Sequence, residues 1–230
     1  MLLLFSLFFV TLAKIISMNK PELIPNPDGT WTLDYPIRPL RPSAVAETER
    51  VESLARSALK RCPWDFGASS MLSDLLAERE EVEEACQVRF DALQRALELI
   101  NDEDIVVDWN DRQCRNMIEL MGQSAVDHFW IQDFEMCAAI CETTLEADPE
   151  DHTGLVPYML YSYVLIEDWE SFDERLMDLD PRSIHYELLE SIRDFDNGVK
   201  TEVRIDAATR QFIEPVCQQI PEWSNLLQVK

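Results

Sequence analysis

Residues 133–151 read DFEMCAAICETTLEADPED, and this stretch decides the fold. Its apolar side chains recur at steps of three and four residues, which is the period of one face of an α-helix. They are Phe134, Cys137, Ala138, Cys141 and Leu145. Asp148-Pro149 ends the pattern, because proline blocks continuation of a helix. The stretch therefore predicts one helix with a single apolar face and a sharp stop.

The same pattern continues on both sides, between residues 112 and 198. Upstream it predicts a helix from Arg112 to the Gln132-Asp133 turn, and downstream it predicts helices over 155–166, 169–179 and 184–195. Asp180-Pro181 and Asn197-Gly198 are further stop signals. Asp168-Trp169-Glu170 repeats Asp133-Phe134-Glu135 after 35 residues. Short helices separated by short turns predict an array of antiparallel helical hairpins.

Residues 112–198 resemble the tetratricopeptide repeat family. In that family an acidic residue and an aromatic residue open the second helix of each repeat and Asp-Pro closes it, with a period of about 34 residues. Ala125 and Cys137 fall at the family's two small-residue positions, where small side chains let the paired helices approach closely. The resemblance implies an all-α fold of antiparallel helical hairpins, stacked as a short solenoid.

The second copy departs from the family's pattern. Leu160 and Phe172 occupy positions that are usually small, and His128 stands where tyrosine is usual. The resemblance also implies a concave groove that binds a protein or a peptide. Its lining would be Val126, Phe129, Trp130, Tyr161 and Val164. Packing of these side chains into the core is the alternative.

The segments before the repeats divide into 1–17, 18–42 and 43–111. Residues 1–17 are almost wholly apolar, as in a signal or an anchor, or they precede a true start at Met18. A start at Met18 predicts a cytoplasmic protein, whereas the other readings predict an exported or membrane-anchored one. Residues 18–42 hold six prolines and predict an extended arm with a short edge strand from Trp31 to Tyr35.

Residues 43–111 and 199–230 are expected to be helical regions outside the repeats. The first predicts a helix from Ser43 to Arg61, then one or two helices that begin at a Ser69 or Ser70 cap and run to Ile100. Residues 101–111 predict a break. The second segment, 199–230, is expected to be a C-terminal helix and tail.

The charge of the chain restricts its partners. With 44 acidic and 20 basic residues the net charge is −24, which excludes nucleic acid, since nucleic-acid binding needs a basic surface. It also excludes docking on an anionic membrane, apart from an anchor at 1–17. Residues 131–200 carry 18 acidic and 4 basic residues, a net of 4 − 18 = −14. This region is either a solvated helical surface or a landing surface for a basic partner.

Motifs for catalysis, cofactors and metals are missing from the sequence. It has no glycine-rich phosphate loop, no nucleophile elbow and no Cys-x-x-Cys pair. Cys137 and Cys141 share a helix face, as buried thiols or as a thiol pair. His128, His152 and His185 have no fixed partner at helical spacing, and His152 is expected to be solvated. We therefore expect no cofactor and no metal, in a non-catalytic protein–protein interaction module whose partner is a protein or peptide, possibly basic. A small acidic enzyme, or an acidic immunity or decoy protein, is the alternative.

Overall fold

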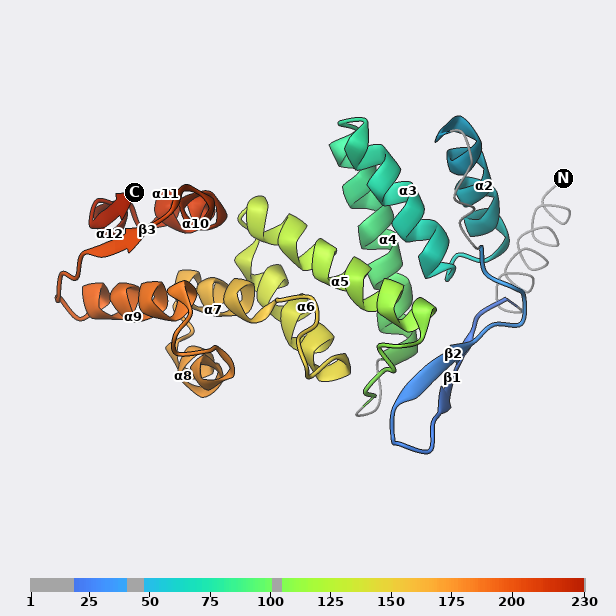
Figure 1. Cartoon of the computed structure of the whole chain (residues 1–230), viewed down its shortest axis with the longest axis horizontal. Coiled ribbons are helices and arrows are strands. Elements are labelled where there is room, and N and C mark those ends of the chain that lie inside the picture. The colour runs from blue at the N-terminus through green and yellow to red at the C-terminus, as the bar shows by residue number, and fades with distance from the viewer. Residues whose placement is uncertain (1–18, 41–47, 101–104, 230) are drawn as a thin grey trace, which may run out of the picture. The chain divides into compact units, whose positions relative to one another are not determined.

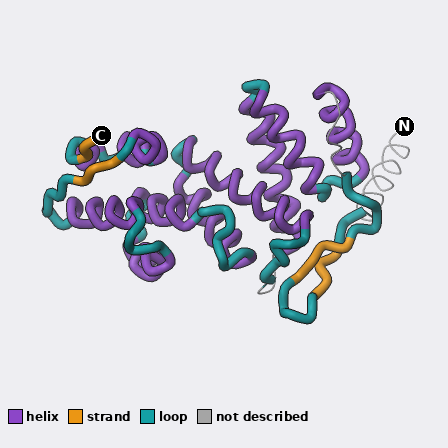
Figure 2. Tube along the Cα trace, in the orientation of Figure 1, coloured by secondary structure: helices purple, strands orange, loops and turns teal. Residues whose placement is uncertain are grey.

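The structure is a computed structural model that describes residues 19–40, 48–100 and 105–229. It is mostly helical, with neighbouring helices packed side by side, which confirms the all-α class (Figures 1 and 2). The segment 1–17 and the start at Met18 lie outside the described residues. Within the described ranges, no helix combines the length and the apolar character needed to cross a membrane.

The elements follow one another as a strand hairpin, a long run of helices and a mixed C-terminal part. The helices are α2 (Thr48–Arg61), α3 (Phe66–Glu78), α4 (Val82–Ile100), α5 (Arg112–Trp130), α6 (Phe134–Ala147), α7 (Val156–Leu165), α8 (Trp169–Arg175), the 3-10 turn η1 (Leu176–Asp178), α9 (Ile184–Asp196), α10 (Ala207–Phe212), α11 (Glu214–Gln219) and α12 (Pro221–Ser224). The strands are β1 (Glu22–Pro25), β2 (Trp31–Asp34), β3 (Val203–Ile205) and β4 (Leu227–Val229).

Helix ends coincide with the local signals in most places. Helix α6 ends just before Asp148-Pro149, and α9 ends just before Asn197-Gly198. The expected cap at Ser69 or Ser70 is wrong. Helix α3 begins earlier, because the carboxylate of Asp65 accepts a hydrogen bond from the Ala68 amide at 3.1 Å and caps the helix there.

The proline-rich arm is a β-hairpin. Strand β2 confirms the alternation seen from Trp31, and β1, which the sequence did not predict, pairs with it in antiparallel register from Glu22↔Asp34 to Pro25↔Trp31. The turn between them contains Gly29 at a φ of 88°, a conformation that glycine adopts at no steric cost. Trp31 also forms a bridge to Val107, so the arm is tied to the segment after α4.

The chain divides into two compact units. Unit 1 comprises Met1–Ser124 and Thr144–Thr153, and unit 2 comprises Ala125–Thr143 and Gly154–Lys230. In unit 1, α3 packs against both α2 and α4 (Figure 1). One hydrophobic cluster in these helices consists of small or aliphatic side chains: Ala55, Ala58, Ala68, Leu72, Leu76 and Ala85. The four alanines let the three helices approach closely.

Three helix pairs, α3/α4, α5/α6 and α7/α8, are joined by turns of the same geometry. In each turn the middle residue is left-handed, with φ of 62° at Glu80, 65° at Gln132 and 60° at Glu167. In each, the next amide donates to the carbonyl five residues back, at 2.9 Å from Glu81 to Leu76, from Asp133 to His128 and from Asp168 to Tyr163. This is the Schellman ending of a helix, and it ends the first helix of each pair. Helix α9 ends in the same way at Gly198.

Alignment on the left-handed residue shows that the three pairs also share buried positions. The residues seven places before it and five places after it have no exposed surface in any pair, namely Ser73 and Ala85, Ala125 and Cys137, Leu160 and Phe172. They are small in the first two pairs and large in the third. The pair α3/α4 therefore follows the pattern of α5/α6, although the sequence reading placed it outside the repeats.

Ala125→Leu tests the tight approach of α5 and α6. Both Ala125 and Cys137 are fully buried, so the extra atoms should overpack the contact and lower the free energy of unfolding by about 1–3 kcal/mol. Urea unfolding measures this loss. Ala139→Leu, on the exposed face of α6, is the matched control and should stay within about 0.5 kcal/mol of the parent. Equal stability of the two variants would contradict the predicted register.

The C-terminal segment of unit 2 is a folded layer, so the expected single helix and tail is wrong. Pro215 and Pro221 stand in the first turns of α11 and α12, and proline interrupts a continuous helix. Strand β3 pairs in parallel with β4, in the register Val203↔Leu227. Trp223 is fully buried, and its indole Nε1 donates to Ser191 Oγ at 3.1 Å.

Candidate functional site

The structure separates the five side chains that were expected to line a groove. Trp130 is 44% exposed and Val126 is half-buried, whereas Phe129 and Tyr161 have no exposed surface and Val164 is 4% exposed. Phe129 and Tyr161 are therefore packed in the core, which was the alternative, and a partner cannot contact them. Trp130 remains available at the end of α5.

The ring of Phe212 on α10 packs against two of the side chains expected to line the groove, Phe129 and Tyr161. Its centroid lies 4.5 Å from Tyr158, 4.6 Å from His185, 6.1 Å from Tyr161 and 6.3 Å from Phe129. Phe212 lies outside the stretch that the family resemblance covers, so the resemblance could not place it. The C-terminal segment thus helps to bury Phe129 and Tyr161.

Each of the three histidines has a partner, in contrast to the expectation from the sequence. His128 Nδ1 lies 3.1 Å from the Asp133 carboxylate, and His185 Nδ1 lies 3.2 Å from Tyr161 Oη. Burial lowers the pKa of His185, and burial raises the pKa of Tyr161. The His185 imidazole is therefore held neutral as part of the aromatic cluster.

His152, in unit 1, is 29% exposed and has fixed partners. Its Nδ1 lies 2.6 Å from the buried Asp148 carboxylate, its Nε2 lies 3.3 Å from Glu150, and its ring stacks on Trp109 at 4.3 Å. Asp148 also accepts the His152 amide at 2.9 Å. Because both ring nitrogens face carboxylates, these contacts stabilise the conformation of the turn that follows α6.

The cysteine pair of α6 is buried, as the sequence indicated. Cys137 and Cys141 have no exposed surface. A hydrogen bond with Cys141 is the main cause that lowers the pKa of Cys137, with Ser162 contributing in the same direction and burial opposing it. Across the part of the chain that the structure describes, no group of three or more His, Cys, Asp or Glu side chains is placed to hold a metal ion.

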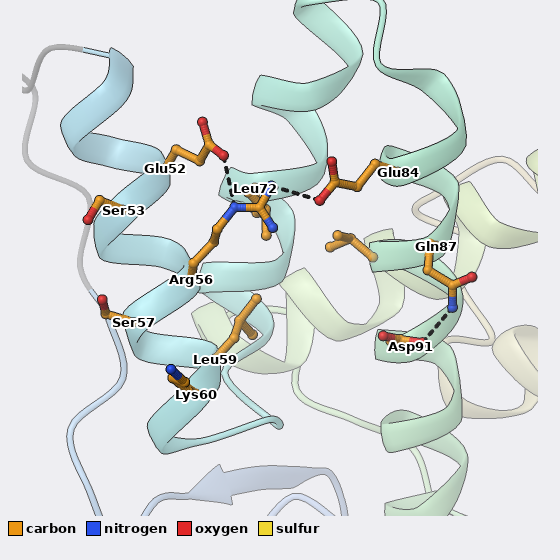
Figure 3. Close-up of a pocket in the computed structure, with 11 residues that line it drawn as sticks. Glu52, Ser53, Arg56, Ser57, Leu59, Lys60, Leu72, Glu84, Gln87 and Asp91 are labelled. Carbon is orange, nitrogen blue, oxygen red and sulfur yellow. Dashed lines mark hydrogen bonds and ion pairs between the residues drawn. The ribbon is translucent and has the colours of Figure 1, made fainter.

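Unit 1 has an open groove between α2 and α4, with α3 as its floor (Figure 3). Its volume is about 740 Å³. The floor is apolar, with Leu72, which is 2% exposed, flanked by Leu59 and Val88. The rims are polar, with Glu52, Ser53, Arg56, Ser57 and Lys60 from α2 and Glu84, Gln87 and Asp91 from α4.

An ion-pair strap crosses this groove. Arg56 contacts Glu52 on its own helix at 2.8 Å and Glu84 on α4 at 2.7 Å, as Figure 3 shows. Glu52 also pairs with Arg79 at 2.6 Å. Past the strap, Lys60 on the α2 rim and Asp91 on the α4 rim give the two sides of the groove opposite charge.

A second pocket, of about 580 Å³, lies within unit 2. It is lined by Val164, Leu165, Glu167, Trp169, Ile192, Phe195, Asp196, Gln219 and Ile220. Val164 is the one predicted groove residue among them. The lining combines aliphatic and aromatic walls with two exposed carboxylates, and it has no basic side chain.

Comparisons with protein-family models, with curated proteins and with solved structures gave no match.

Proposed function

We propose that the chain is a divergent tetratricopeptide-like protein that binds a partner protein non-catalytically. The groove between α2 and α4 carries this proposal, because, beside the Arg56–Glu84 ion pair that crosses it, it is apolar at its floor and polar at both rims. The shared turns of the three helix pairs support the repeat architecture.

The partner segment is an amphipathic helix. Its apolar stripe would lie on Leu59, Leu72 and Val88, as amphipathic helices do in hydrophobic grooves. Lys60 on one rim and Asp91 on the other favour a helix with acidic side chains along one flank and basic side chains along the other. This charge arrangement also fixes the direction in which the helix binds.

Selection from a displayed peptide library, with the full chain as bait, tests the proposal. We expect enriched peptides with apolar residues at helical spacing and opposite charges on the two flanks. Val88→Glu places a charge in the groove and should weaken binding of these peptides by about tenfold or more, about 1.4 kcal/mol.

Val82→Glu is the matched control, since Val82 stands on α4 at 59% exposure and does not line the groove. It should leave the affinity unchanged. The proposal fails if no peptide is enriched, or if Val88→Glu and Val82→Glu bind the selected peptides equally well.

A further inference from the structure

The pocket of unit 2 lies where three helices end. Helix α7 ends at Leu165, α9 at Asp196 and α11 at Gln219, and all three residues line it. The last carbonyls of a helix carry partial negative charge, so helix C-termini favour cations. Several of these carbonyls already accept backbone hydrogen bonds, as Tyr163 does from Asp168 and Asp194 from Val199. The helix ends therefore contribute little, and the charge of the pocket comes from its side chains.

Side chains add full negative charge and aromatic surface to the same pocket. Glu167 and Asp196 are exposed carboxylates on its lining, with Trp169 and Phe195 beside them. Trp169 is supported from within by Phe172, whose ring meets it edge to face at 5.5 Å. Aromatic faces attract cations, and carboxylates bind guanidinium groups through paired hydrogen bonds.

We propose that this pocket binds an arginine side chain of a partner polypeptide. Its aliphatic stem would pack on the apolar walls, and its guanidinium would lie against the aromatic rings within reach of Glu167 and Asp196. Arginine suits this combination better than lysine, because its planar head both stacks on rings and pairs with carboxylates. Unit 2 carries 19 acidic and 7 basic residues, a net charge of −12, which would draw such a segment in. The pocket lies in a different unit from the α2–α4 groove and is an independent site.

The test uses the full chain and two labelled peptides. Both have one variable central position flanked by leucine and glycine. One peptide carries arginine there, and the other carries citrulline, which has nearly the same shape but no charge. Fluorescence anisotropy should show at least a tenfold preference for the arginine peptide. Glu167→Gln with Asp196→Asn should reduce this preference to about one. Gln132 already occupies the same left-handed turn position as Glu167, so glutamine fits that backbone.

Glu187→Gln with Glu190→Gln is the matched control. It removes the same charge from exposed positions of α9 outside the pocket, and it should keep the preference. Trp169→Leu should weaken arginine binding severalfold with the carboxylates intact. The proposal is overturned if arginine and citrulline peptides bind equally, if neither binds at about 1 mM, or if the control pair loses as much as the pocket pair. Val88→Glu should not change the preference, so failure of the groove proposal is distinguishable.

Discussion

Phe129→Ala should lower the free energy of unfolding by about 3–5 kcal/mol. Phe129 has no exposed surface, and its ring lies 5.2 Å from Tyr158, 5.7 Å from Phe134 and 6.3 Å from Phe212. Removal of the ring leaves a cavity among aromatic side chains that cannot collapse fully. Urea unfolding followed by circular dichroism measures the loss.

The neighbouring residue is the control for this prediction. Trp130 follows Phe129 on α5 but is 44% exposed, so Trp130→Ala should cost about 1 kcal/mol or less. The groove expected from the family resemblance treats both residues as accessible anchors and predicts small, similar effects on stability. A Phe129→Ala variant as stable as Trp130→Ala would therefore restore the open groove and refute the burial of Phe129 against Phe212.

Sequence signals were sufficient wherever structure depends on near neighbours. Asp148-Pro149 and Asn197-Gly198 end helices in the structure because proline and glycine act within one turn of the chain. The turn at Gln132-Asp133 was recognised for the same reason. Its counterpart at Glu80-Glu81 was recognisable too, since Glu81-Val82-Glu83 has the acidic–apolar–acidic order of Asp133-Phe134-Glu135. It lies 52 residues before Asp133, so it falls outside the 35-residue recurrence that relates Asp133 to Asp168.

The candidate site depended on contacts between distant segments, and there the sequence was insufficient. Whether Phe129 lines a groove or a core is decided by Phe212, which follows it by 83 residues. No periodicity in α5 carries that information. The pocket of unit 2 likewise assembles from the ends of α7, α9 and α11, each of which looks like an ordinary helix end by itself. The sequence did indicate that this region is acidic and that it contains aromatic side chains.

Trp223→Ala should also lower the free energy of unfolding by about 3–5 kcal/mol, although it lies seven residues from the end of the chain. Trp223 has no exposed surface, and its Nε1 donates to Ser191 Oγ on α9 at 3.1 Å. The substitution therefore opens a large cavity and removes one hydrogen bond, which contributes about 0.5–1.5 kcal/mol. The Ser191 hydroxyl keeps its own hydrogen bond to the Thr201 carbonyl at 3.4 Å.

Trp223→Phe separates these two causes. It keeps an aromatic ring in the cavity but removes the donor, so its cost should be clearly smaller than that of Trp223→Ala. Urea unfolding of the two variants and the parent, with limited proteolysis of the native state, gives the comparison. If residues 203–229 form the folded layer, they should resist cleavage in the parent and become susceptible in Trp223→Ala. A C-terminal tail, in contrast, would be cleaved in the parent, and Trp223→Ala would change its stability by less than about 0.5 kcal/mol.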